Sequence, residues 1–240
     1  MKRISAAVIA LLVFATSCQF LGGERISGDG HITTQSKNTG SFSSVDVSGS
    51  VKVHVRQDAS NSVKIEADQN LMEYIEVYTE GDKLVIKTKN GYNLSPSKDI
   101  VAYISAPVYK DIDVSGACDV IGENAITGNS ELSMHTSGSG NIQMEVNIPK
   151  LSTEVSGNGN ISLKGKVTDF SATVSGSGDI RCFDLETENT RLDLSGSSDA
   201  EVNANKSLNV DASGSSQVKY KGNASVSQDI SGSGSVKKVG

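Results

Sequence analysis

The sequence has no tryptophan and only three histidines among its 240 residues. Five phenylalanines and six tyrosines are all its aromatic residues, so the core must rest on valine, isoleucine, leucine and small side chains. The histidines, His31, His54 and His135, are far apart in the chain, and no serine occupies the strand-to-helix turn of a hydrolase. We therefore expect no enzyme, no catalytic residue, no metal and no cofactor.

Positive charge is also scarce. Lysine and arginine total 22 against 28 aspartates and glutamates, which gives a formal net charge of −6. Binding to the phosphate backbone of a nucleic acid depends on clustered lysine and arginine. The composition therefore excludes nucleic acid as a partner.

Long apolar runs are missing except at the N-terminus. There, Lys2 and Arg3 precede an apolar stretch over 4–14, and Ala15-Thr16-Ser17-Cys18 matches a bacterial lipobox. This predicts a lipoprotein signal peptide over 1–17, whose removal takes two positive charges and changes the net charge from −6 to −8. The alternative is an ordinary signal peptide that Cys18 merely follows.

On the lipoprotein hypothesis, Cys18 is acylated and is the first residue of the mature protein. Its acyl chains bind the membrane, and 18–30 forms a flexible tether. We expect a protein of the bacterial cell envelope, on the outer membrane. The sequence assigns it neither to the periplasmic face nor to the cell-surface face of that membrane.

One short phrase recurs from residue 110 to the C-terminus: an apolar residue, Ser-Gly or a close variant, two small residues, a polar residue and an apolar residue. Its glycines stand at 116, 138, 157, 176, 196, 214 and 232, in steps of 22, 19, 19, 20, 18 and 18 residues. Repetition at a near-constant period of about 20 residues is typical of a solenoid. Seven phrases predict about seven coils over 110–240.

Apolar residues alternate with polar ones on both sides of each phrase, which indicates half-buried strands. Glycine permits a positive φ at the corner between them. We therefore predict an all-β fold, a β-solenoid of the single-stranded β-helix kind, in which each coil has a strand, a Ser-Gly corner, a second short strand and a looser return. No helical period competes with this pattern.

The N-terminal section over 31–109 is strand-rich but less regular. Strands are predicted over 42–47, 51–56, 62–67, 74–79, 83–88 and 100–105. A shortened copy of the phrase stands at Val47-Ser48-Gly49, which is 67 residues before Gly116. This section is either about three larger coils of the same solenoid or a sandwich-like cap.

The two cysteines after Cys18 occupy defined positions within the repeat. Cys118 occupies the corner position of Gly140 and Gly159, and Cys182 is an inward strand position. They are three coils apart, about 14 Å at the usual strand spacing. That exceeds the ~7 Å between Cα atoms that a disulfide spans, so we predict that Cys182 is a small core residue.

An outward column of acidic residues is the strongest candidate site. The residue two before each repeated serine is acidic in five of the seven phrases: Asp113, Glu154, Asp193, Asp211 and Asp229. One interpretation is a solvated face that discourages aggregation. The other is a face that binds a divalent cation or a basic partner. The column has no basic partner at a fixed register.

The polar residue after each corner invites comparison with calcium-binding β-rolls, whose repeats carry glycines and aspartates. Here that position varies between Asp119, Asn141, Asn160 and Gln217, whereas hard cations need oxygen ligands in every layer. We interpret these residues as structural turn residues.

The segment 103–116, Tyr-Ile-Ser-Ala-Pro-Val-Tyr-Lys-Asp-Ile-Asp-Val-Ser-Gly, and the serial Ser-Gly phrases after it resemble a known family. It is the head GIN domain family of auto-transporter adhesins, exported lipoproteins of Bacteroidetes. The resemblance covers about 40–236 and implies a β-helix-like fold with an adhesin-like role.

We therefore expect a non-enzymatic adhesin-like or scaffolding protein that presents an extended surface to a protein or glycan ligand. The alternative is a carbohydrate-binding or carbohydrate-active β-helix. A ligand loop at Asn90, Tyr92 and Asn93 would serve it, because tyrosines concentrate in this section. Lys237 and Lys238 would discourage edge pairing and favour a monomer over a weak homo-oligomer.

Overall fold

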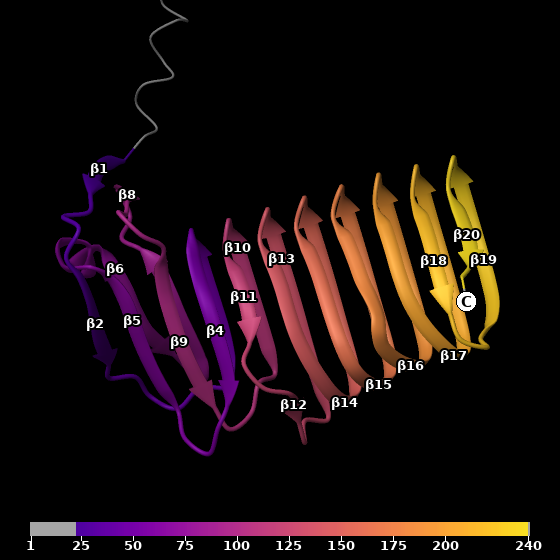
Figure 1. The fold of residues 1–240 in the computed structure, drawn as a ribbon, viewed down its shortest axis with the longest axis horizontal. Coiled ribbons are helices and arrows are strands. Elements are labelled where there is room, and N and C mark those ends of the chain that lie inside the picture. Colours follow the sequence, from indigo (N-terminus) through magenta and orange to yellow (C-terminus); the bar gives the residue numbers. More distant parts are fainter. Residues whose placement is uncertain (1–22, 240) are drawn as a thin grey trace, which may run out of the picture.

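The computed structural model describes residues 23–239, and nearly all of its regular structure is β-strand. The strands stack side by side in one long row, from an N-terminal cap in indigo to the terminal coil in yellow (Figure 1). The predicted all-β solenoid of about seven coils is confirmed.

Each coil has two straight legs that run in opposite directions around a flat core. We call the stack of legs that end at the Ser-Gly corner sheet I, and the stack of legs that begin after it sheet II. Sheet I holds β3 (Ser44–Gly49), β10 (Asp111–Gly116), β13 (Glu131–Gly138), the second halves of β14 (Asn141–Gly157), β15 (Asn160–Gly176), β16 (Asp179–Gly196) and β17 (Asp199–Gly214), and β19 (Ser225–Gly232). Sheet II holds β4 (Val51–Gln57), β11 (Asp119–Gly122), the first halves of β14 to β17, β18 (Gln217–Lys221) and β20 (Ser235–Lys238), and the short β12 (Ile126–Thr127) pairs with β14 near the bend.

The return between the two legs is tighter than the sequence suggested. In β14 the register with β15 runs from Asn141 to Gly157, and only Pro149, at the bend, has no partner in it. The inward residues alternate on both legs, from Ile142 to Ile148 and from Leu151 to Val155, and all are buried. The expected loose return is therefore wrong for this coil, because the strand turns the second corner without a loop.

The solenoid begins earlier than residue 110. β3 pairs in parallel with β10, and Gly49 lies beside Gly116. β4 pairs in the same way with β11. The shortened phrase at Val47-Ser48-Gly49 thus belongs to a coil of the same stack. Residues 58–109 form an excursion that packs on the side of this coil opposite to β10 and β11.

The excursion forms the cap, which contains β5 (Ser62–Asp68), the short 3-10 helix η2 (Gln69–Tyr74), β6 (Ile75–Glu80), β7 (Lys83–Thr88), β8 (Tyr92–Ser95) and β9 (Ile100–Ala106), and is joined by β1 (Glu24–Ser27) and β2 (Ile32–Lys37). β7 and β9 add one more parallel layer next to β3 and β4. β2, β5 and β6 then run antiparallel to their neighbours. The section combines one layer in continuation of the stack with an antiparallel cover, rather than three larger coils.

One hydrophobic core runs the length of the molecule, from Phe42 and Val45 in the first coil to Val218 near the last. The corner position is buried at Cys118, Gly140 and Gly159. Cys118 and Cys182 are both free and buried, so the predictions that they form no disulfide and that Cys182 is a small core residue are confirmed. In the part of the chain that the structure describes, no helix has the length and hydrophobicity to cross a membrane.

Candidate binding faces of the solenoid

The acidic column is formed on sheet I as the repeat predicted. Strand pairing aligns Asp113 with His135, then in turn Glu154, Thr173, Asp193, Asp211 and Asp229. The column also extends into the first coil, because Asp46 lies beside Asp113. Sequence reasoning missed Asp46, although the shortened phrase after it was the signal.

Basic side chains neutralise part of this column. His135 lies 3.4 Å from Glu154 and 3.5 Å from Asp111, which stands on the same face. Arg191 binds both oxygens of Asp193, at 3.0 and 2.8 Å. These partners stand at single coils, because the row of Arg191 otherwise holds Ser152, Ser171 and Asn209. Arg191 reaches Asp193 because residues two apart on a strand point to the same face.

Packing between coils also perturbs two carboxyls at the cap end of sheet I. Desolvation raises the pKa of Asp46, and the neighbouring Asp113 adds to the effect. Desolvation likewise raises the pKa of Asp111, against the opposing charge of His135. Asp46 belongs to the acidic column, whereas Asp111 lies in the neighbouring row with Ser44 and Ser133. In residues 23–239 no group of three or more His, Cys, Asp or Glu side chains is placed to hold a metal ion.

A column of serines stands beside the acidic one. The serine of every corner pairs with the next, from Ser48 through Ser115 and Ser137 to Ser231. Each points outward, because the residues before it, such as Val114 and Val155, are buried. Sheet I therefore presents a hydrophilic surface of serine and carboxylate rows, with hollows of about 220 and 260 Å³ over its later coils.

The polar residues after the corner form a ladder on sheet II. The Asn160 amide donates to Asn141 at 2.8 Å, and the Asn141 amide donates to Asp119 at 2.7 Å. These hydrogen bonds run along the stack from coil to coil and so use the groups that a cation would need. They support the interpretation of these positions as structural turn residues.

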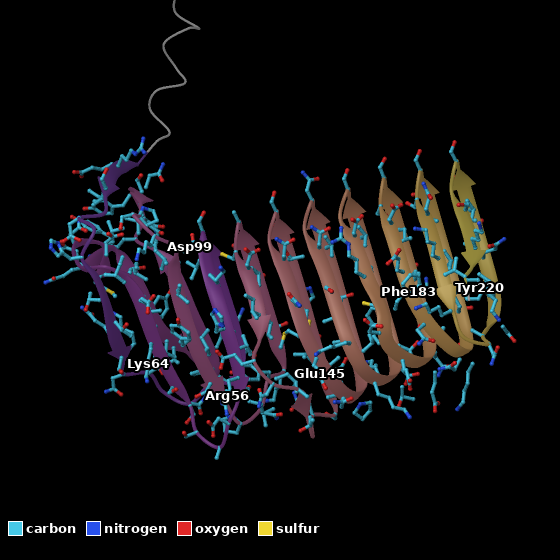
Figure 2. The ribbon with its side chains drawn as sticks, in the orientation of Figure 1. Arg56, Lys64, Asp99, Glu145, Phe183 and Tyr220 are labelled. Atoms are coloured by element: carbon cyan, nitrogen blue, oxygen red, sulfur yellow. The ribbon has the colours of Figure 1, made fainter. Side chains whose placement is uncertain are left out.

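Sheet II also carries a hollow of about 380 Å³, which lies over the middle coils. Its lining includes Gln143, Ser162, Arg181 and Phe183. Glu145, which also lines it, and Phe183 lie between the cap and Tyr220 of the terminal coils (Figure 2). A second hollow of about 160 Å³ lies toward the cap, where the His54 and Tyr103 rings stack at 5.1 Å.

A β-bulge forms one end of the larger hollow. Arg181 pairs with Ser162 and Asp184 with Lys164, so that Cys182 and Phe183 together stand opposite one residue of β15. Against β17, the register moves directly from Cys182 to Glu186. Phe183 points outward by the same alternation that buries Ile180 and Cys182. The bulge adds Asp184 to the outward face before Leu185 returns to the core. Bulges commonly re-aim side chains in this way. Lys221 lies 4.5 Å from the centre of the Phe183 ring.

The sequence prediction placed stacking aromatics only in the N-terminal section and so missed Phe183. The signal was the alternation itself, because Ile180 and Cys182 are inward positions and the next residue, Phe183, must point outward. The 20-residue step from Gly176 to Gly196, between neighbours of 19 and 18 residues, signals the bulge. An extra residue in a coil has to bulge if the corners remain aligned.

The predicted ligand loop is located in the cap. Asn90 and Asn93 are exposed, whereas Tyr92 begins β8, is half-buried and packs against Tyr74 with ring centres 4.6 Å apart. The structure therefore brings the Tyr92 ring against a neighbour rather than leaving it free. Cys18, the predicted lipidation site, lies outside the described residues.

Comparison with known proteins identifies the fold and the family. A solved structure called a putative adhesin, from Bacteroides fragilis, shares 22% identity at a TM-score of 0.83 and covers 89% of this chain and 100% of its own. Another, called a putative lipid binding protein, from Parabacteroides distasonis, shares 25% identity at a TM-score of 0.76, with 90% and 100% covered. A putative adhesin from Parabacteroides merdae shares 20% at 0.70, again with 90% and 100% covered.

A search of curated proteins returned no match. The family model described as "Putative auto-transporter adhesin, head GIN domain" matches residues 41–224. This range begins next to the first coil and ends just before β19, so it spans the cap excursion and all of the repeated phrases except the last. The chain belongs to the head GIN domain family of putative auto-transporter adhesins.

Proposed function

We propose that this protein is a non-enzymatic binding or scaffolding protein of the bacterial cell envelope. The observation that carries the proposal is the continuous parallel pairing from β3 to β19 on sheet I and from β4 to β20 on sheet II, which builds two long faces with ordered side-chain rows. Solenoids generally use such extended surfaces for binding. The family described above as adhesins supports the same role.

The proposed anchor is an acylated Cys18 in the outer membrane. The lipobox of the sequence supports it, since two or more acyl chains hold a protein stably to a bilayer where one gives only marginal binding. Acylation would place the solenoid at the membrane surface. Of the predicted tether over 18–30, β1 (Glu24–Ser27) pairs with β8 in the cap, so the proposed tether is the part before it. Cys18→Ala should move the protein from the membrane fraction to the soluble fraction; if the variant stays in the membrane fraction, the anchor is wrong.

Binding itself is tested on cells. A deletion strain should adhere less to a mucin-coated or polysaccharide-coated surface than the strain that carries the gene, and the Cys18→Ala protein should not restore adhesion. Equal adhesion of both strains on every surface would contradict the binding role. Release of sugar from a polysaccharide panel by the purified protein would contradict the non-enzymatic assignment.

A further inference from the structure

We infer that the hollow on sheet II is a binding site for a neutral oligosaccharide, with Phe183 as its stacking platform. The inference deepens the proposed binding function by naming a site and a ligand class. It rests on four features of the hollow: its position over paired strands, its length, its balance of charge, and the aromatic ring at one end.

The hollow lies over interior strands. β15 pairs with β14 on one side and with β16 on the other, so its backbone hydrogen bonds are used within the sheet. A peptide could not add to this surface as a strand, because strand addition needs a free edge. Away from the bulge at Phe183, where the pairing of β16 with β17 is interrupted, only side chains are available to a ligand, which must therefore carry its own hydrogen-bonding groups along its length.

The hollow is long and shallow rather than deep. One register column runs along it, from Ile121 through Gln143, Ser162 and Arg181 to Glu201. Four steps of about 4.8 Å span roughly 19 Å. Ser162 is the smallest side chain of that column and lies between the long Gln143 and Arg181, which leaves room above it. A length of this kind suits several linked sugars rather than one.

Charges along the hollow are mixed and mostly paired. Glu145, Asp184 and Glu201 face Lys164 and Arg181, which leaves a formal balance of −1. The Lys164 ammonium lies 3.3 Å from Glu145, and the Arg181 guanidinium lies 3.1 Å from Asp179. Because these pairs already neutralise the cations, an acidic polymer gains little here. Fixed charged and amide groups can still donate to and accept from hydroxyl groups.

Phe183 supplies the apolar contact. Its ring is half-buried at the bulge, and Lys221 packs on it at 4.5 Å, which fixes its position at the end of the hollow. Ligand sites typically combine such an apolar or aromatic surface with a few placed polar groups. A sugar offers the matching chemistry, because its hydroxyl edge is polar while its C–H face is apolar. A neutral oligosaccharide meets the length, the balance of charge and the side-chain surface together.

The test is titration calorimetry of the full-length protein in detergent with neutral hexasaccharides: cellohexaose, xylohexaose, mannohexaose, maltohexaose and chitohexaose. Hexagalacturonate serves as the acidic comparison. At least one neutral hexasaccharide should bind, and more tightly than hexagalacturonate. Phe183→Ala should weaken that binding at least ten-fold, while Phe183→Tyr, which keeps the ring, should retain it.

A second variant keeps the test independent of the bulge. Ser162→Phe should fill the hollow and weaken binding at least ten-fold, whereas Ser152→Phe places the same side chain outward on sheet I and should leave binding unchanged. Circular dichroism checks that each variant is folded. The inference is overturned if no neutral hexasaccharide binds, if hexagalacturonate binds more tightly, or if Phe183→Ala and Ser162→Phe both leave the affinity unchanged. Cells that adhere although no hexasaccharide binds would overturn this site and leave the proposed adhesive role standing.

Discussion

A Cβ atom on Gly138 would lie 2.5 Å from the carbonyl oxygen of Gly116, its neighbour in the adjacent coil. The same oxygen accepts a hydrogen bond from the Ser139 amide at 2.9 Å. Gly138 also has a φ of +111°, which L side chains rarely adopt. Close stacking and backbone conformation thus require glycine at this corner for two separate reasons, and the corner column repeats them from coil to coil.

Gly138→Ala should therefore be far more destabilising than an ordinary glycine substitution. We expect a loss of about 3 kcal/mol or more, since strained φ costs ~1–3 kcal/mol and each ladder hydrogen bond lost adds about 1 kcal/mol. Gly128→Ala is the matched control, because Gly128 has a φ of +74° but no heavy atom within 4 Å of an added Cβ. It should cost about 1–2 kcal/mol. Urea unfolding of both variants measures the difference, and equal losses would show that close approach does not matter.

The repeated part of the fold could be predicted from sequence because its signals are local. Alternation sets which residues face inward, and glycine marks each corner, so positions such as Leu151 and Gly157 can be assigned from neighbours alone. The acidic column follows from the same count. Register is strongly specified here, because a one-residue slip would expose every buried side chain.

The remaining features depend on contacts between distant segments. β3 pairs with β10 across an excursion of more than fifty residues, and no local pattern shows which coil follows which. Alternation from Ile180 and Cys182 places Phe183 outward. Asp184, by contrast, joins it on that face only because the strand bulges to keep Gly176 and Gly196 aligned. The alternation rule assumes that no strand bulges, and it locates neither the hollow nor the cap's antiparallel pairs.

Two buried threonines on β16 provide a double-mutant test. The Thr187 and Thr190 hydroxyl oxygens lie 2.6 Å apart, and Thr187 donates to the Asn203 carbonyl at 2.8 Å. Thr190 must then donate to Thr187. Thr187→Val leaves the buried Thr190 hydroxyl without its acceptor and should lower the free energy of unfolding by ~1–3 kcal/mol. Thr190→Val should lower it by less.

Replacing both threonines should cost clearly less than the sum of the single substitutions, because no unpaired hydroxyl then remains in the core. We expect a coupling of at least ~0.5 kcal/mol from urea unfolding of the four proteins. Additive costs would contradict the shared hydrogen bond. Thr173→Val, at an exposed position on sheet I, controls for the change of side chain alone.

Cys182 should be unreactive until the solenoid unfolds. It is 1% exposed, and burial raises the pKa of its thiol to about 12. Only the thiolate attacks a disulfide reagent, so raising the pH from 7 to 9 should not speed its modification in the native protein. In a Cys18→Ser background, we expect the reaction to follow the urea transition. The control is Val226→Cys, at a 37% exposed position, where the introduced thiol should react without unfolding and faster at pH 9 than at pH 7. If Cys182 in the native protein reacts as fast as this exposed thiol, the burial is contradicted.

Asp68 joins the segments of the cap, and its effect should depend on pH. Its buried carboxylate accepts hydrogen bonds from the Gly30 amide at 2.8 Å and from the Ser97 amide and hydroxyl at 2.9 and 2.5 Å. The Ser97 hydroxyl, above all, lowers the pKa of Asp68, so the folded state favours the charged form. The resulting stability is present above the unfolded pKa of about 3.9 and is lost as the pH falls through the lower folded value.

Asp68→Asn, which replaces one acceptor oxygen by a donor, should cost ~1–3 kcal/mol in urea unfolding at pH 7 and less at pH 3. Asp99→Asn removes an exposed carboxylate that pairs with Lys52 at 3.6 Å, and it should cost under ~1 kcal/mol at both values. A cost for Asp68→Asn that stays constant from pH 7 to pH 3 would contradict the role of the buried charge.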